Sequence, residues 1–132
     1  FTDVFQAGAC RYAVCDLTAM AKDTHRFEAR YCDGLVGAWP TERHLYEKRS
    51  PLLNADQIRC PVLFFQGLQD KVVPPEQTER MAEALRNNGI PVEVRLFEDE
   101  GHGFRNQATQ IEVLKETEAF FRHQLGLAEQ RI

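Results

Sequence analysis

The chain has 132 residues, of which 43% are hydrophobic and 10% aromatic, so it can bury a core and is not a disordered segment. Its net charge of -4 is spread along the chain without a basic cluster, which argues against a nucleic-acid or anionic-membrane partner. No apolar run approaches membrane-spanning length, and the opening Phe1-Thr2-Asp3 is not a signal peptide. Because the sequence does not begin with Met, we expect it to be a piece of a longer chain.

The first half of the chain predicts one strand, two helices and a long connection. Residues 9–14 form a short strand, and Asp16 then offers a side-chain oxygen to cap a helix that begins at the next residue. Two glycines and a proline break the chain over residues 34–40. A short helix follows over residues 43–48, and Ser50-Pro51 forces an extended turn.

The second half opens with a buried strand and an amphipathic helix. Residues 61–65 are a continuous apolar run, typical of a strand that is covered on both faces inside a parallel sheet. Pro74 and Pro75 lead a helix that Gly89 ends. The apolar face of this helix consists of Met81, Ala82 and Leu85.

The chain closes with another strand over residues 92–97 and a helix that ends at Gly126. We expect this helix to bury one apolar stripe, which consists of Ile111, Leu114, Phe121 and Leu125. The alternation of buried strands and helices predicts a parallel α/β sheet with right-handed crossovers and flanking helices.

Two loops follow the two clearest strands, and each carries a residue suited to acid–base chemistry. Asp70 follows the strand at 61–65, and His102 follows the strand at 92–97 between two glycines. The carboxyl ends of neighbouring parallel strands meet at one edge of a sheet, where ligands bind in such folds. We therefore expect Asp70 to accept the ring N–H of His102, which leaves the other ring nitrogen as a general base.

The remaining cysteines, histidines and acids predict no further site. The four cysteines contain no C-x-x-C pair and lack zinc-finger spacing, so we expect free thiols, no metal and no cofactor. Free thiols favour a reducing compartment, and we expect a cytoplasmic location. We expect solvated side chains at His25, His44, His123, Glu98, Asp99 and Glu100.

Several segments resemble a known family. GLQDKVVPPEQ (67–77) and FEDEGHGF (97–104) are similar to the acid and histidine segments of α/β-hydrolases, specifically the prolyl oligopeptidase family of serine peptidases. Residues 16–40 and 46–67 resemble that family's connection between its sixth and seventh strands, closest to its acylaminoacyl-peptidase and dipeptidyl-peptidase-like members. The resemblance implies the C-terminal portion of an α/β-hydrolase fold and a serine-type peptidase that hydrolyses short peptides.

In the order of that family, Asp70 and His102 would be the last two members of a Ser-Asp-His triad, but the nucleophile is missing. Ser50 is the chain's single serine, and it lacks the glycines of a G-x-S-x-G elbow. Residues 8–12 match only half of a G-x-C-x-G cysteine elbow. We therefore expect residues 1–132 to be one fragment of a peptidase catalytic domain, inactive by itself.

The resemblance also implies a pocket for the substrate residue that precedes the scissile bond. In the dipeptidyl-peptidase branch a Y-x-x-x-Y segment lines this pocket, and Phe27 and Tyr31 have the same spacing, although Phe27 departs from the tyrosine. Val73 resembles a valine that helps to wall the pocket. Core packing of the aromatic pair and loop packing of Val73 are the alternatives.

The sequence is also compatible with two other functions. An esterase or dienelactone-hydrolase-like enzyme would use the same aspartate and histidine, and a non-catalytic domain would retain them as inherited residues. If the chain belongs to a peptidase or to an esterase, we expect its partner to be a peptide or another small substrate. We also expect the fragment to associate with itself through an exposed sheet edge.

Overall fold

The computed structural model describes residues 3–23 and 31–127, and its centre is a parallel sheet of three strands. The strands are β1 (Gly8–Arg11), β2 (Val62–Gly67) and β3 (Val92–Phe97). They lie in the order β1-β2-β3, with β2 paired in parallel to both neighbours. The predicted parallel α/β class is confirmed.

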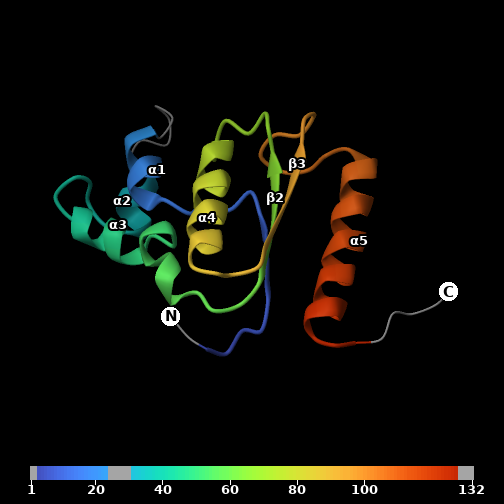
Figure 1. Ribbon diagram of the computed structural model, residues 1–132. Helices are drawn as coiled ribbons and strands as arrows, with labels where there is room; N and C mark the ends of the chain where they lie inside the picture. Colours follow the sequence, from blue (N-terminus) through green and yellow to red (C-terminus); the bar gives the residue numbers. More distant parts are fainter. Residues whose placement is uncertain (1–2, 24–30, 128–132) are drawn as a thin grey trace.

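Helices cover both faces of this sheet. The helical elements are α1 (Leu17–Asp23), α2 (Tyr31–Leu35), α3 (Arg43–Arg49), the 3-10 segment η2 (Leu52–Gln57), α4 (Pro75–Asn87) and α5 (Gln107–Gln124). Figure 1 shows the sheet between α4 and α5, with α1, α2 and α3 beside α4. None of the helices in the described part of the chain has the length and apolar content to cross a bilayer.

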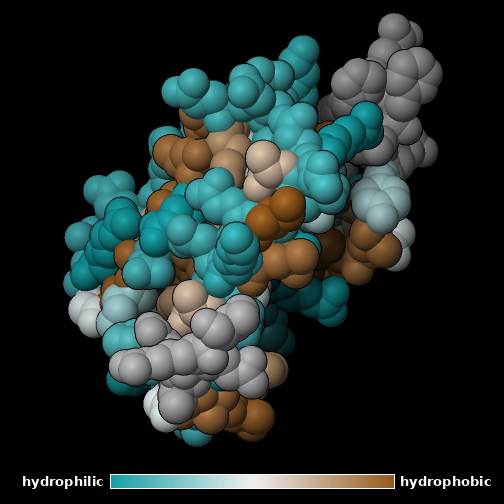
Figure 2. All heavy atoms as spheres, turned by 90° about the vertical axis from the view of Figure 1, so that its right-hand side faces the viewer, coloured by the Kyte–Doolittle hydropathy of each residue, from teal (hydrophilic) through white to brown (hydrophobic). Residues whose placement is uncertain are grey.

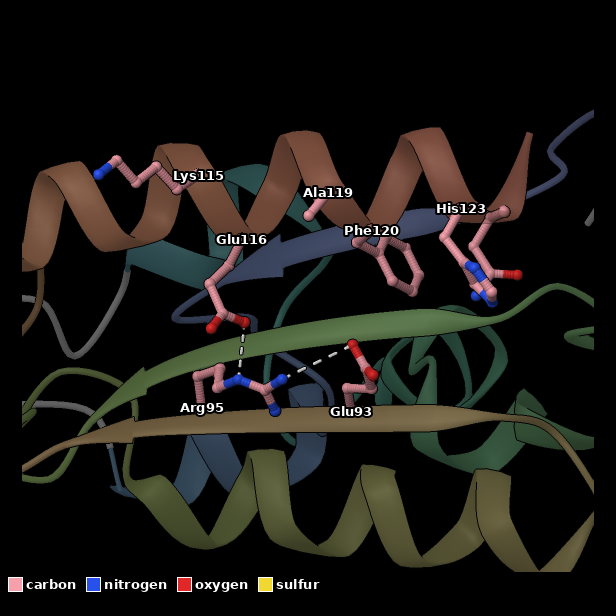
Figure 3. A pocket seen from close by; sticks show the side chains of 8 residues that line it. Glu93, Arg95, Lys115, Glu116, Ala119, Phe120 and His123 are labelled. Atoms are coloured by element: carbon pink, nitrogen blue, oxygen red, sulfur yellow. Dashed lines mark hydrogen bonds and ion pairs between the residues drawn. The ribbon is translucent and has the colours of Figure 1, made fainter. Parts of the chain in front are cut away.

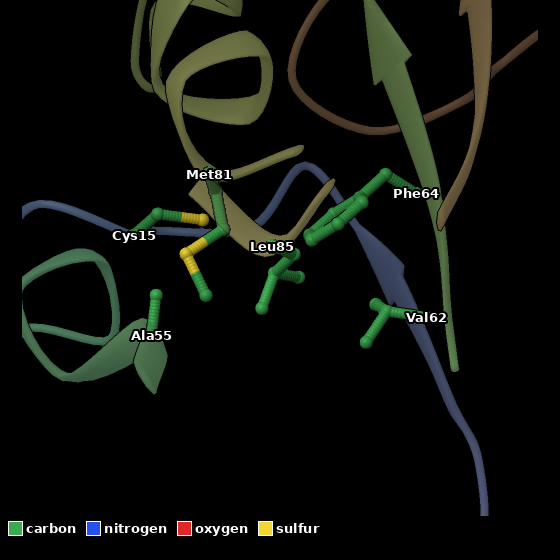
Figure 4. Close-up of a cluster of buried hydrophobic side chains, with 6 residues drawn as sticks. All are labelled: Cys15, Ala55, Val62, Phe64, Met81 and Leu85. Atoms are coloured by element: carbon green, nitrogen blue, oxygen red, sulfur yellow. The ribbon is translucent and has the colours of Figure 1, made fainter. Parts of the chain in front are cut away.

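The central strand β2 divides its side chains between two hydrophobic clusters, because successive residues of a strand point to opposite faces. Val62 and Phe64 pack against α4 in the cluster drawn in Figure 4. Leu63 and Phe65 belong to the second cluster, on the α5 side. Every residue of β2 is buried, as the continuous apolar run predicts.

Strand β1 is shorter than the sequence predicts. It ends at Arg11 because Tyr12 has a positive φ of 41°, which leaves the extended region. The Tyr12 N–H still donates to the Phe65 carbonyl at 2.8 Å. The chain then reaches α1, where the Asp16 side chain accepts the N–H of Ala19 at 3.0 Å and acts as the predicted cap.

Helix α5 buries a different face from the one that the sequence predicts. Its buried residues are Thr109, Val113 and Phe120. Leu114 of the predicted stripe is 63% exposed and Ile111 is 44% exposed. Leu114 follows Val113 by one residue, a rotation of about 100° around the helix, so this end of the stripe is turned aside from the sheet. Phe121 of the predicted stripe is partly buried and packs against the cluster on the α5 side. Figure 2 views this side of the molecule and shows a mostly hydrophilic surface with separate hydrophobic patches.

Candidate active site

The loops after β2 and β3 meet at the carboxyl edge of the sheet. Asp70 lies three residues beyond the end of β2, and His102 lies in the loop after β3. The Oδ2 atom of Asp70 is 2.9 Å from Nδ1 of His102, which is hydrogen-bonding distance. The predicted contact between the two side chains is confirmed.

The Asp70 carboxylate is held in a fixed orientation. Its side chain is fully buried, and its Oδ1 accepts the backbone N–H groups of Val72 at 2.9 Å and Val73 at 2.8 Å. A carboxylate can only accept, so Nδ1 of His102 donates in this contact and Nε2 is the ring nitrogen that remains for another partner. The His102 side chain is 38% exposed, so the pair is buried on the acid side and accessible on the histidine side.

The two loops also contact each other through their backbones. The Gln69 N–H donates to the Glu100 carbonyl at 3.0 Å, and the Leu68 N–H donates to the Phe97 carbonyl at 2.9 Å. At Gly67 a Cβ atom would lie only 2.3 Å from the Glu100 carbonyl oxygen. Glycine is required at position 67 because the histidine loop passes directly over it.

Glu100 corrects an expectation, because it is buried rather than solvated. Only 2% of it is exposed, and its carboxylate accepts the N–H groups of Arg105 at 2.7 Å and Asn106 at 2.9 Å. Burial raises the pKa of Glu100, but these backbone hydrogen bonds, with side-chain hydrogen bonds from Thr109 and Asn106, bring it below its usual value. The carboxylate closes the loop that carries His102.

One aromatic ring packs against His102, and two further rings pack behind it. The Tyr12 ring lies with its centroid 4.9 Å from the imidazole centroid and 5.2 Å from that of Phe104. Phe104 in turn packs edge-on against Phe97 at 5.3 Å. In the sequence, Tyr12 stands where a cysteine elbow would need its second glycine, and no local pattern places it beside a histidine. Its positive φ is the structural signal of a special position.

The serine and two of the cysteines, Cys10 and Cys15, are held in unreactive environments. Ser50 is fully buried, and its hydroxyl accepts the N–H of Leu17 at 2.9 Å and donates to the Tyr46 carbonyl at 2.8 Å. All four cysteines are free thiols. Burial raises the pKa of the Cys15 thiol to about 12, with further contributions from Cys10 and Asp16. Burial and the nearby Cys60 also raise the pKa of the Cys10 thiol. Raised pKa values keep these thiols protonated and unreactive.

The predicted pocket residues have different environments. Tyr31 is 66% exposed on α2, so it does not pack in the core of this chain. Val73 is 1% exposed and contacts Asp70 through its backbone. Phe27 lies outside the described residues, as does His25. His44 and His123 are exposed, as predicted.

A charged groove between β3 and α5 lies away from this edge. It is lined by Glu93, Arg95, Lys115, Glu116, Ala119, Phe120, His123 and Gln124. Figure 3 shows Arg95 between two glutamates, 2.7 Å from Glu116 and 3.9 Å from Glu93. Its cation is therefore already paired. Within the described residues no cluster of three histidines, cysteines or acids is arranged to hold a metal ion.

Comparison with known proteins assigns the chain to a family. The model of the prolyl oligopeptidase family matches residues 1–128. Over 88 residues the chain is 39% identical to dipeptidyl aminopeptidase BIII of Pseudoxanthomonas mexicana, covering 67% of this chain and 12% of that protein. A puromycin-hydrolysing peptidase of Mycobacterium tuberculosis superimposes with a TM-score of 0.94 and 44% identity, over 99% of this chain and 20% of that one.

A more distant structure shares the fold. The acylaminoacyl peptidase of Pyrococcus horikoshii superimposes with a TM-score of 0.80 at 23% identity, over 99% of this chain and 22% of that one. The chain thus spans between about one eighth and one fifth of these proteins. With a family match that runs through nearly all of its residues and an Asp–His contact at the expected edge of the sheet, the chain belongs to the prolyl oligopeptidase family of α/β-hydrolases.

Proposed function

We propose that this chain is the C-terminal part of the catalytic domain of a serine-type peptidase. In this proposal Asp70 and His102 complete a Ser-Asp-His triad with a serine supplied by another part of the protein. The 2.9 Å contact between Oδ2 of Asp70 and Nδ1 of His102 carries the proposal. Family membership over residues 1–128 supports it.

The chemistry follows from the roles of the two side chains. Nε2 of His102 takes the proton of the serine hydroxyl as the oxygen attacks the substrate carbonyl, and later gives that proton to the leaving amine. The buried Asp70 carboxylate orients the imidazole and stabilises the imidazolium that forms between these two steps. Its two backbone hydrogen bonds hold the carboxylate in place, so little reorganisation accompanies the reaction.

The proposed substrates are short peptides, as for an acylaminoacyl- or dipeptidyl-peptidase-like enzyme. The similarity to a dipeptidyl aminopeptidase supports this class. Tyr31, with Phe27 and Val73, is proposed to shape the pocket for the residue before the cleaved bond. The exposure of Tyr31 leaves its ring available for contact. The substitution Tyr31→Ala in the whole protein is expected to lower kcat/KM for peptide amides.

The test uses the whole protein with Asp70→Asn and His102→Ala, and Leu114→Ala on the exposed face of α5 as the control. We expect Asp70→Asn to lower kcat about 10⁴-fold, because an amide no longer selects the required tautomer. His102→Ala is expected to abolish acylation by an organophosphorus probe, while Leu114→Ala leaves it unchanged. Turnover of peptide amides that survives both active-site substitutions would refute the proposal.

The same assay separates the two alternatives. An esterase would cleave activated esters at a rate that depends on His102 but leave peptide amides intact. A non-catalytic domain would be silent with both substrate types and unaffected by either substitution. The peptidase proposal requires cleavage of the amide.

We further propose that the 132-residue chain by itself is inactive, self-associating and cytoplasmic. Ser50 is buried and hydrogen-bonded, so it offers no nucleophile. In the described part of the chain β1 pairs only with β2, so its outer edge has backbone groups available for another copy. Light scattering should detect dimers or larger species, and a monomer at high concentration would contradict the association.

The proposed cytoplasmic location is tested by cell fractionation of the whole protein. The free thiols support this location, because thiols stay reduced in the cytoplasm.

A further inference from the structure

We propose that Tyr12 is a positioning residue for His102. The aromatic ring of Tyr12 holds the His102 imidazole in the plane from which Nε2 takes the serine proton. The inference rests on the proposed function, because it assigns Tyr12 a part in the same proton transfer. The starting observation is a contact between two residues that follow the outer strands of the described sheet. Tyr12 follows β1 and His102 follows β3, and these strands lie on opposite sides of β2.

The backbone at Tyr12 is the reason that its side chain can make this contact. Adjacent strands are about 4.8 Å apart, so a group at the end of β1 must reach across the width of two strand spacings to meet the loop after β3. The positive φ of 41° at Tyr12 ends the strand, while its N–H keeps the hydrogen bond to Phe65. A non-glycine residue seldom adopts this conformation, and such residues cluster at functional sites.

The histidine needs a second constraint besides the aspartate. The contact with Asp70 restrains the imidazole at Nδ1 alone, on the side opposite to the reacting nitrogen Nε2. Glycines flank His102 on both sides and pair with each other in an isolated antiparallel bridge, so they hold the backbone of the loop but bring no side chain against the ring. The loop is closed at a distance by Glu100, but that carboxylate contacts backbone groups at 105 and 106 rather than the ring.

The Tyr12 ring supplies the missing constraint. Its centroid lies 4.9 Å from that of the imidazole at an interplanar angle of 56°, and the Phe104 ring also packs against it, at 5.2 Å. Phe104 itself is packed against Phe97 at the end of β3. The imidazole therefore has a ring against it that is anchored to β1 and supported from β3. Proton transfer depends steeply on such placement.

The experiment measures steady-state kinetics of the whole protein on a peptide amide with Tyr12→Phe, Tyr12→Gly and Tyr12→Leu. Glycine removes the ring but accepts the positive φ, so the backbone is kept. Leucine keeps apolar volume if the glycine variant does not fold. We expect the glycine and leucine variants to lose roughly 10- to 100-fold in kcat with KM changed less than about twofold. Tyr12→Phe keeps the ring and is expected to retain kcat.

Several results would overturn the inference. Tyr12 would be ordinary packing if the variants that fold match the control Leu114→Ala in kcat. A rise in KM alone would make Tyr12 a binding residue, and an equal loss in Tyr12→Phe would assign the effect to the hydroxyl. The proposed function is tested separately by His102→Ala, because retained turnover in that variant refutes the triad whatever the Tyr12 variants do.

Discussion

Replacing Gly67 by Ala should separate the two loops that form the Asp–His contact. The new Cβ would lie 2.3 Å from the Glu100 carbonyl oxygen and 2.6 Å from the carbonyl oxygen of Gly101. These are backbone atoms and cannot rotate away. Carbon and oxygen normally approach to about 3.3 Å, so the histidine loop must retreat by about 1 Å. Overpacking of this kind costs about 1–3 kcal/mol of folding free energy.

Urea unfolding of the chain, followed by circular dichroism at low concentration, measures the loss of stability. Gly8→Ala is the matched control, because no atom lies within 4 Å of the added carbon. We expect the control to change the free energy of unfolding by less than about 0.5 kcal/mol. In the whole protein, a 1 Å displacement of the histidine should lower kcat about 10²-fold. Equal stability of the two variants would show that the loops do not depend on the close approach at Gly67.

Two further substitutions test the buried polar groups near the site. Glu100→Gln should destabilise the chain at neutral pH by weakening the hydrogen bonds that close the histidine loop. The pKa of Glu100 is lower in the folded chain than in the unfolded chain, so ionised Glu100 stabilises the fold above about pH 4.3. This stabilisation is lost as the pH falls through the folded pKa. The melting temperatures of wild type and variant should therefore converge in acid. Ser50→Ala should cost about 1 kcal/mol in urea unfolding, because it leaves the partly buried N–H of Leu17 without its acceptor. It should leave kcat of the whole protein unchanged. A loss of kcat without a loss of stability would give Ser50 a role in the reaction.

The parts of the fold that the sequence predicts well are those in which local pattern and tertiary contact agree. Residues 61–65 are apolar throughout, and β2 is buried on both faces. Residues 92–97 match the bounds of β3, and Pro75 begins α4 as its fixed φ allows. The meeting of Asp70 and His102 was also predictable, since adjacent parallel strands end at one edge of the sheet.

The parts that the sequence does not predict depend on contacts between distant segments. The apolar stripe of α5 has a helical period, but period alone does not say which face meets the sheet, and Val113 rather than Leu114 is buried. Glu100 belongs by composition to an acidic turn, and only the return of the chain at residues 105 and 106 buries it. The contact of Tyr12 with His102 crosses the central strand, so no local pattern encodes it.

The acid–histidine half of the proposed triad is assembled by contacts inside this chain. Asp70 is oriented by two N–H groups from its own loop, and the histidine loop is closed by Glu100. Neither set of contacts involves the segment that would carry the serine. The geometry of the pair should therefore form when these strands fold, whereas the rate also needs the nucleophile and the donors that stabilise the oxyanion. It follows that Gly67 and Glu100, which touch no reacting atom in this mechanism, should influence kcat through the position of His102.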